Sequence, residues 1–226
     1  MVKIIPFAGK RAIINGTQWE ARLLMNLFLA SRSPRRQDIL HRLGLRFDTL
    51  VSPFEEIIPL RHPDPPALAC HLASEKMRHL NVPDGNGIVI TADTIVFLDD
   101  RVLGKPTDRR SAREMLELLA GRTHGVTTAL CLCDLARNRQ CCEAAVTRVT
   151  FTPIPDSLLN RYLDTEEWTD KAGAYGIQGQ ASLFTRSIEG CYFNVVGFPV
   201  NLFYGLIQQL GYDLDMFSPA ESNHRG

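Results

Sequence analysis

The chain has 226 residues, of which 45% are hydrophobic and 22% are charged, so it can bury a sizeable core in one large domain or two small ones. Its 25 Lys and Arg residues balance 25 Asp and Glu residues, which excludes the overall positive field of a duplex nucleic-acid-binding protein. No run of about 18 apolar residues occurs, so we expect neither a membrane span nor a membrane partner.

The two ends of the chain differ in composition from the part between them. Residues 1–26 begin with a basic, mildly apolar segment without a long apolar stretch and a small-residue cleavage site, so a secretory signal is not expected. We interpret these residues as an N-terminal extension, with a targeting peptide as the alternative. Residues 27–211 form the predicted domain and residues 212–226 a polar tail. A cytoplasmic location fits this organisation.

The first strong pattern is an apolar strand, Leu27–Ala30, followed at once by the polar segment Ser31–Arg36. Pro34 suits the first position of a helix, where its missing N–H costs nothing, and we predict a helix over Pro34–Leu43. Hydroxyl groups, guanidinium groups and the free N–H groups of a first helical turn would meet at one point, which suits a phosphate. A solvated helix start with Ser33 as N-cap is the alternative.

Two acidic residues, Glu55 and Glu56, follow the next predicted strand, Arg46–Val51, and precede a proline-rich loop. They are either surface charges or metal ligands, because sites in α/β sheets gather at strand ends. Beyond the loop, leucines and alanines at helical spacing predict a helix over Pro66–Leu80 that carries Lys76 near its end. By composition alone, Lys76 suits an ordinary solvated lysine.

The strongest strand is Gly87–Leu98, which is apolar on both faces and is therefore expected in the centre of a sheet. Asp93 stands in its middle, and a carboxylate is costly to bury there unless it is paired, bound to a metal or used in chemistry. A structural Asp bonded to backbone N–H groups is the alternative. After a turn, the chain returns to Gly104–Pro106, which places Lys105 on a rigid, exposed loop.

The second half of the chain contains further regular elements and a glycine-rich loop. We expect a long hairpin formed by Val126–Asp134 and Cys141–Phe151, and a strand end or turn over Asn194–Pro199. The expected helices are Ser111–Leu119, Asp156–Leu163 and Val200–Leu210. Three glycines within seven residues of Lys171–Gly179 predict a loop whose backbone comes close to another group. His124, before the hairpin, is expected to be structural.

Six cysteines are present, and their spacing matches no zinc ribbon or finger. Cys131 and Cys133 share one face of a predicted strand, and Cys141 and Cys142 would lie across the hairpin from them. Reduced thiols in a cytosolic protein are the expected state, with a metal site as the alternative.

Six motifs occur together in the order and spacing of one protein family. They are Leu29–Arg36, Ala92–Thr94, Gly104–Pro106, Gly121–His124, Asp170–Gly179 and Asn194–Pro199. Through them the chain resembles the Maf family of nucleoside triphosphate pyrophosphatases over about residues 27–210. The resemblance implies an α/β fold of the inosine-triphosphate-pyrophosphatase (Maf/Ham1) type: an elongated mixed sheet with flanking helices and two lobes around a cleft. It also implies a homodimer.

The resemblance implies hydrolysis of a nucleoside triphosphate to the monophosphate and pyrophosphate, with a divalent cation, Mg²⁺ or Mn²⁺. It makes Asp93 the general base, and Glu56 and Asp93 are the candidate metal ligands; whether Asp93 is base, ligand or both stays open. The phosphate-binding turn and the other substrate-binding positions fall on Ser31, Ser33, Arg35, Arg36, Lys76, Lys105 and Gln178. No Ser or Cys has the setting of an activated nucleophile, so we expect direct attack of water on the α-phosphorus.

Three positions indicate a branch of the family. Arg35, Thr94 and Gln178 match the branch that acts on dTTP and UTP, with CTP or modified pyrimidine nucleotides as further substrates, and they differ from the branch that acts on 7-methyl-GTP. We therefore predict a dTTP/UTP pyrophosphatase. The alternatives are a 7-methyl-GTP pyrophosphatase and a septum-related nucleotide-binding protein without turnover.

Overall fold

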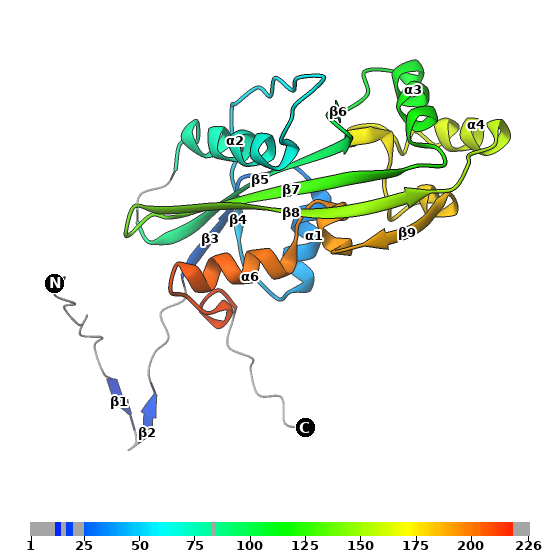
Figure 1. The fold of residues 1–226 in the computed structure, drawn as a ribbon. Coiled ribbons are helices and arrows are strands. Elements are labelled where there is room, and N and C mark those ends of the chain that lie inside the picture. Colours follow the sequence, from blue (N-terminus) through cyan, green and yellow to red (C-terminus); the bar gives the residue numbers. More distant parts are fainter. Residues whose placement is uncertain (1–11, 15–16, 20–24, 83–84, 219–226) are drawn as a thin grey trace, which may run out of the picture.

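A mixed sheet of seven strands runs through the computed structural model, which describes residues 12–14, 17–19, 25–82 and 85–218. The strand order is β4-β3-β5-β7-β8-β9, and β6 pairs with β5 outside this path (Figure 1). β3 runs parallel to β4 and β5, whereas the remaining pairs among these described strands are antiparallel. The bounds are β3 (Asn26–Leu29), β4 (Asp48–Thr49), β5 (Gly87–Leu98), β6 (Arg101–Leu103), β7 (Thr123–Asp134), β8 (Arg139–Phe151) and β9 (Thr185–Glu189), with a separate pair of β1 (Ala12–Ile14) and β2 (Thr17–Trp19).

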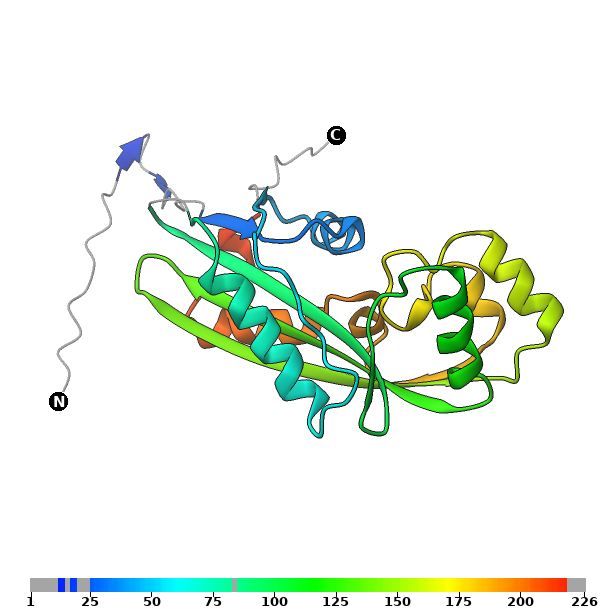
Figure 2. The same ribbon diagram turned by 90° about the horizontal axis from the view of Figure 1, so that it is seen from above.

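Helices cover both faces of this sheet and one of its ends. α2 lies on one face, α1 and α6 lie on the opposite face, and α3 and α4 stand together at the end that carries β9 (Figure 1). The view from above shows two lobes joined by the long strands β5, β7 and β8 (Figure 2). The bounds are α1 (Pro34–Arg42), α2 (Pro65–Arg78), α3 (Arg109–Leu119), α4 (Asp156–Asp164), α5 (Tyr192–Val196) and α6 (Val200–Gln209), with short 3-10 helices η1 (Ala172–Ala174), η2 (Gln180–Leu183) and η3 (Leu214–Met216).

Alternate residues of β5 pack into two separate apolar clusters. Val89 and Ile95 belong to the cluster beneath α2, whereas Ile90 belongs to the larger cluster on the other face of the sheet. Because side chains alternate along a strand, Asp93 shares the α2 face with Val89 and Ile95, and Thr94 points to the other face. The central strand thus presents two neighbouring polar side chains on opposite sides.

Most predicted elements are confirmed, with ends that shift by at most three residues, and Gly87–Leu98 forms β5 from its first residue to its last. The strand predicted over Arg46–Val51 is too long, because only β4 joins the ladder. After Thr49, the N–H of Leu50 still donates to Leu29 O at 2.9 Å, and the chain then leaves the sheet for the proline-rich loop.

The strand end or turn predicted over Asn194–Pro199 is also wrong, because this segment contains most of α5. Gly197 ends that helix with a φ of 112°, a left-handed value that glycine adopts without strain. No described helix is both long and apolar enough to cross a membrane. The predicted extension and tail fall largely outside the described residues, so the domain boundaries stay predictions.

Candidate functional site

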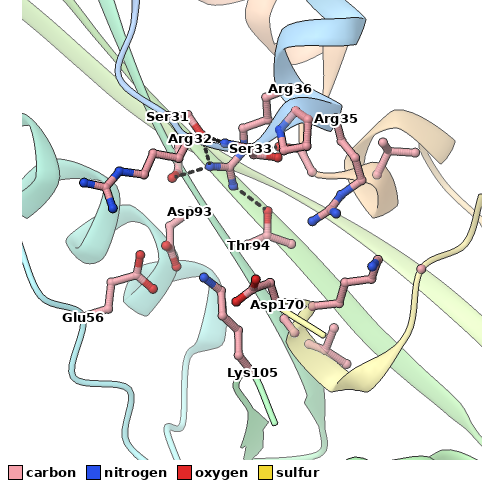
Figure 3. A pocket seen from close by; sticks show the side chains of 18 of the residues that line it. Ser31, Arg32, Ser33, Arg35, Arg36, Glu56, Asp93, Thr94, Lys105 and Asp170 are labelled. Carbon is pink, nitrogen blue, oxygen red and sulfur yellow. Dashed lines mark hydrogen bonds between the residues drawn. The ribbon is translucent and has the colours of Figure 1, made fainter. Parts of the chain in front are cut away.

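A cleft of about 580 Å³ opens where the two lobes meet. Its walls come from the turn before α1, the loop between β4 and α2, the middle of β5, and the loop between α4 and η2 (Figure 3). The structure brings every site residue predicted from the sequence to this cleft: Ser31, Ser33, Arg35, Arg36, Glu56, Lys76, Asp93, Thr94, Lys105 and Gln178.

The turn before α1 leads into a helix that starts at a proline and has no side-chain cap hydrogen bond. Pro34 is the first helical residue, as predicted, and Ser33 stands at the N-cap position. The Ser33 hydroxyl makes no cap hydrogen bond, and the Ser33 backbone N–H donates to Ser31 Oγ at 3.2 Å. The fixed φ of Pro34 sets the helix start, which leaves the Ser33 hydroxyl at the wall of the cleft.

Arg36 has a half-buried side chain that links three segments of the chain. Its Nη1 donates to Ser31 Oγ and to Ala92 O, both at 3.1 Å. Its Nε donates to Gly197 O at 2.8 Å, and its Nη2 donates to Thr94 Oγ1 at 3.0 Å (Figure 3). Four of the five guanidinium N–H groups are therefore engaged, so Arg36 has one left for a ligand.

Thr94 extends this network across the sheet. Thr128 Oγ1 donates to Asn194 O at 2.9 Å, so its 3.0 Å contact with the Thr94 hydroxyl must be donated by Thr94. Thr94 in turn accepts from Arg36. The donors therefore follow one direction, from Arg36 through Thr94 and Thr128 to the backbone of α5.

On the opposite face of β5, one lysine lies between two carboxylates. Lys76 Nζ donates to Asp93 Oδ1 and pairs with Glu56 Oε1 at 2.6 Å. The Asp93 side chain is 4% exposed, and its Oδ2 is buried without a hydrogen-bond partner. Burial raises the pKa of Asp93, against the opposing charge of Lys76. Burial would also raise the pKa of Glu56, but Lys76, Lys105 and Arg36 together outweigh it and lower that pKa.

Two further cations point into the cleft from different walls. Lys105, from the loop after β6, reaches toward Asp93 (Figure 3). The Arg35 guanidinium lies on the same side of the cleft as Asp170 (Figure 3). Burial lowers the pKa of Arg35, and the charge of Asp170 opposes that shift. The loop of Lys105 is tied to η1, because the N–H of Gly173 donates to Gly104 O at 3.0 Å. The cleft thus combines cations with a buried carboxylate that has a free oxygen.

A family model for Maf-like proteins matches residues 26–210, most of the chain. The chain belongs to the Maf family. Three relatives, each named dTTP/UTP pyrophosphatase, support this membership. The one from Carboxydothermus hydrogenoformans is 42% identical over 83% of this chain and 100% of its own length, and the one from Clostridioides difficile is 40% identical over 80% and 100%. The one from Alkaliphilus oremlandii is 46% identical over 78% and 92%.

Among solved structures, a nucleoside-triphosphatase / dITP/XTP pyrophosphatase from Mycobacterium abscessus is 16% identical, with a TM-score of 0.34 over 58% of this chain and 76% of that one. The family match and the mixed sheet with flanking helices confirm the predicted Maf-type α/β fold.

One wall of the Maf cleft is held by contacts that the sequence did not reveal. Tyr175 OH lies 2.8 Å from His124 Nε2, and the N–H of Gly176 donates to Tyr162 OH at 3.3 Å. These bonds fix the backbone just before the turn at residues 177–179, which exposes Gln178 to the cleft. The structural role expected for His124 fits its burial, which lowers its pKa to about 4 and keeps the ring neutral at pH 7. No sequence spacing signals a contact between residues 51 positions apart.

Asp170 is a second feature of this wall that sequence reasoning missed. Its φ is 57°, and Glu166 and Ala174 have similar values of 58° and 62°. Left-handed backbone at non-glycine residues costs free energy and tends to gather at functional sites. Asp170 stood in a recognised motif, but its carboxylate was not expected to accompany Arg35 in the cleft.

Proposed function

We propose that this Maf protein hydrolyses dTTP and UTP to the nucleoside monophosphate and pyrophosphate. The observation that carries the proposal is the buried Asp93 carboxylate, which has one oxygen held by Lys76 and the other free, beside the cations of a cleft large enough for a nucleotide. The three relatives named dTTP/UTP pyrophosphatase support the choice of substrate.

Each charged group has a separate task in this proposal. Asp93 Oδ2 accepts a proton from the attacking water, and its raised pKa makes it a stronger base than an ordinary carboxylate. Lys105 and Arg35 neutralise the triphosphate, because phosphoryl transfer depends mainly on positioning and charge stabilisation. Arg36 contributes its positive charge but acts chiefly by holding the turn that presents Ser31 and Ser33.

The carboxylates of Glu56 and Asp93 fit a divalent cation. Lys76 brings both to one point, and Asp93 Oδ2, which has no partner, can take either the cation or the proton of the water, so these two roles of Asp93 are alternatives in the proposal. The described residues contain no group of three or more His, Cys, Asp or Glu side chains arranged for a metal, so phosphate and water oxygens would complete the coordination. Mg²⁺ or Mn²⁺ bound here would neutralise phosphate charge and make the water more acidic.

Base choice is assigned to the walls around Arg35 and Gln178. Arg35 comes from the first turn of α1 and Gln178 from the loop before η2, so the two can contact one nucleotide from different sides. The Thr94 hydroxyl already donates to Thr128 and accepts from Arg36. We therefore assign Thr94 an indirect role, in which it sets the position of Arg36 and of the turn beside it.

The decisive test of the catalytic assignment is Asp93→Asn in the purified full chain. Pyrophosphate release from dTTP with Mg²⁺ should fall by about 10²- to 10⁴-fold, because the base is lost while side-chain volume is kept. The matched control is Asp100→Asn, which alters an exposed carboxylate paired with Arg61 and should leave the rate unchanged. A wild-type rate in Asp93→Asn would disprove the assignment.

A nucleotide panel tests the substrate. dTTP, UTP, CTP, 7-methyl-GTP and ITP are compared by kcat/KM for pyrophosphate release, with and without Mg²⁺. We expect dTTP and UTP to be preferred and activity to require the cation. Preference for 7-methyl-GTP would favour the other branch, and nucleotide binding without pyrophosphate release would favour the non-catalytic alternative. The homodimer and the cytoplasmic location stay predictions; light scattering of the full chain tests the first.

A further inference from the structure

Three cysteines from three different elements meet beneath α2, and none of these described residues lines the cleft. Cys131 on β7 and Cys142 on β8 stand directly opposite each other in the antiparallel ladder. Cys70 on α2 lies above them, and the Cys142 thiol contacts Cys70 O at 3.6 Å. All three belong to the apolar cluster that packs α2 onto the sheet.

The sulfur of Cys142 is the centre of this cluster, because Cys131 stands opposite Cys142 in the ladder and Cys142 Sγ donates to Cys70 O at 3.6 Å. The neighbouring Cys131 and Cys70 thiols lower the pKa of Cys142 against its burial, whereas the pKa values of Cys131 and Cys70 are raised. Cys142 is half-buried, while Cys131 is fully buried. A small oxidant in solution therefore reaches Cys142 first.

The backbone spacing suits a covalent bond between Cys131 and Cys142. Residues directly opposite on antiparallel strands have Cα atoms about 4.5–5.5 Å apart, within the range of about 4.4–6.8 Å found in disulfides. The Cys131 sulfur is also held in place, because Gln140 Nε2 donates to it at 2.9 Å. Oxidation would therefore need little backbone movement.

We propose that Cys142 and Cys131 form a peroxide-reactive dithiol site that closes into an intramolecular disulfide. The Cys142 thiolate attacks one oxygen of hydrogen peroxide, which breaks the O–O bond, yields a sulfenic acid and releases hydroxide. The Cys131 sulfur then attacks the Cys142 sulfur, and the hydroxyl group leaves as water with the Cys131 proton. The hydroxide takes the proton first lost by Cys142. Two thiols are oxidised, and one peroxide is reduced to two waters.

This crosslink should leave the cleft almost unchanged. It joins two residues that the β7–β8 ladder already pairs, and it leaves α2, which carries Lys76, free of any new bond. We expect the oxidised chain to keep its dTTP turnover within about two-fold. The site is independent of the proposed catalysis, since its oxidation is measured without nucleotide.

The experiment treats the reduced full chain with equimolar hydrogen peroxide, blocks remaining thiols with N-ethylmaleimide, and maps tryptic peptides without reduction. Trypsin separates the two cysteines into Thr123–Arg137 and Gln140–Arg148, so the disulfide appears as a linked pair of peptides. These peptides also contain Cys133 and Cys141, which makes variants necessary. Cys141→Ser is the matched control, because Cys141 packs against the cluster on the opposite face of the sheet.

We expect the linked pair in the wild type, in Cys133→Ser and in Cys141→Ser, and its loss in Cys142→Ser. In Cys131→Ala, dimedone should label Cys142 in preference to Cys141. Circular dichroism checks that each variant is folded. The proposal is overturned if the wild type gives no linked pair, if the linked pair persists in Cys142→Ser, or if Cys142 is joined to Cys70 in peptide His62–Lys76.

Discussion

The two faces of β5 differ at adjacent residues: the polar group on one face is fully hydrogen-bonded, whereas the polar group on the other has an oxygen without a partner. On the face away from α2, Arg36 donates a hydrogen bond to Thr94, Thr94 donates to Thr128, and Thr128 donates to a backbone carbonyl of α5. On the α2 face, Asp93 is buried with one oxygen bonded to Lys76 and the other unbonded.

This difference separates a rigid support from a reactive group. A buried polar network whose members are bonded fixes one arrangement of the chain, whereas a buried oxygen without a partner costs free energy unless a ligand uses it. The Thr94 face therefore holds the turn, β5 and α5 in place. The Asp93 face keeps unsatisfied charge at the point where the proposed reaction occurs.

Among the tests of this difference between the two faces, Lys76→Met should have the largest effect on activity and stability. It leaves Asp93 and Glu56 as two close carboxylates without their shared cation, so one of them takes up a proton. We expect pyrophosphate release to fall by about 10²-fold. The free energy of unfolding in urea should fall by about 3 kcal/mol. Arg78→Met is the control, because it removes an exposed pair with Glu75 on the same helix and should change neither quantity measurably.

The pH dependence of Asp93 tests the same face without removing a side chain. Its pKa is raised above the ordinary 3.8, so the folded chain holds this proton more tightly than the unfolded chain. The stability from this group is present below pH 3.8 and is lost as pH rises through the folded pKa. Wild type should therefore lose stability relative to Asp93→Asn as pH rises through that window, measured by urea unfolding without divalent cations. Glu56, with a lowered pKa, contributes the opposite trend below its ordinary 4.5.

Activity should rise as pH rises through the pKa of Asp93, whereas the stability contribution of this group falls, since the proposed base works only as a carboxylate. The acid limb of kcat/KM should lie above the range of an ordinary Asp, with a slope of about ten-fold per pH unit. An acid limb at or below the ordinary value for Asp would contradict the raised pKa.

Thr94→Val tests the support face with a change of similar shape. It leaves Arg36 Nη2 without this acceptor and removes the donor to Thr128, so we expect a loss of about 1–3 kcal/mol in the free energy of unfolding. The turn beside Arg36 should loosen, which would raise KM for dTTP more than it lowers kcat. Thr123→Val is the matched control, because its hydroxyl bonds to Thr150 at an exposed cross-strand pair. Equal losses in both variants would show that the Thr94 network has no special role.

The sequence predicted what local patterns determine. A continuous apolar run identified β5, and the cost of a buried carboxylate singled out Asp93 before any contact was known. The family motifs then named the residues that the structure brings to the cleft. The sequence did not separate the roles of Arg35 and Arg36, because their adjacent motif positions suggested that both bind phosphate. Successive helical residues point about 100° apart, so Arg36 turns inward to Gly197, 161 positions away, while Arg35 faces the cleft.

Other misses have the same physical origin. α5 has five residues, too few for a helical period to show, and its end depends on Gly197 in a left-handed conformation. The left-handed φ of Asp170 and the contact of Tyr175 with His124 depend on the folded loop and leave no trace in residue spacing.

The smallest expected effect comes from Tyr175→Phe, which extends the comparison to the Gln178 wall of the cleft. The change removes one hydroxyl whose 2.8 Å bond to His124 is buried and should cost about 1 kcal/mol in the free energy of unfolding. KM for dTTP should rise about two- to three-fold with kcat almost unchanged, because the loop is held less firmly while Asp93 is untouched. Tyr204→Phe, whose exposed hydroxyl accepts from Gln208, is the control for losing a tyrosine hydroxyl.

Since burial lowers the pKa of His124 to about 4, the ring stays neutral and the difference between Tyr175→Phe and wild type should be constant from pH 6 to pH 8. A fall in kcat comparable to that of Asp93→Asn would instead place this wall in the chemical step.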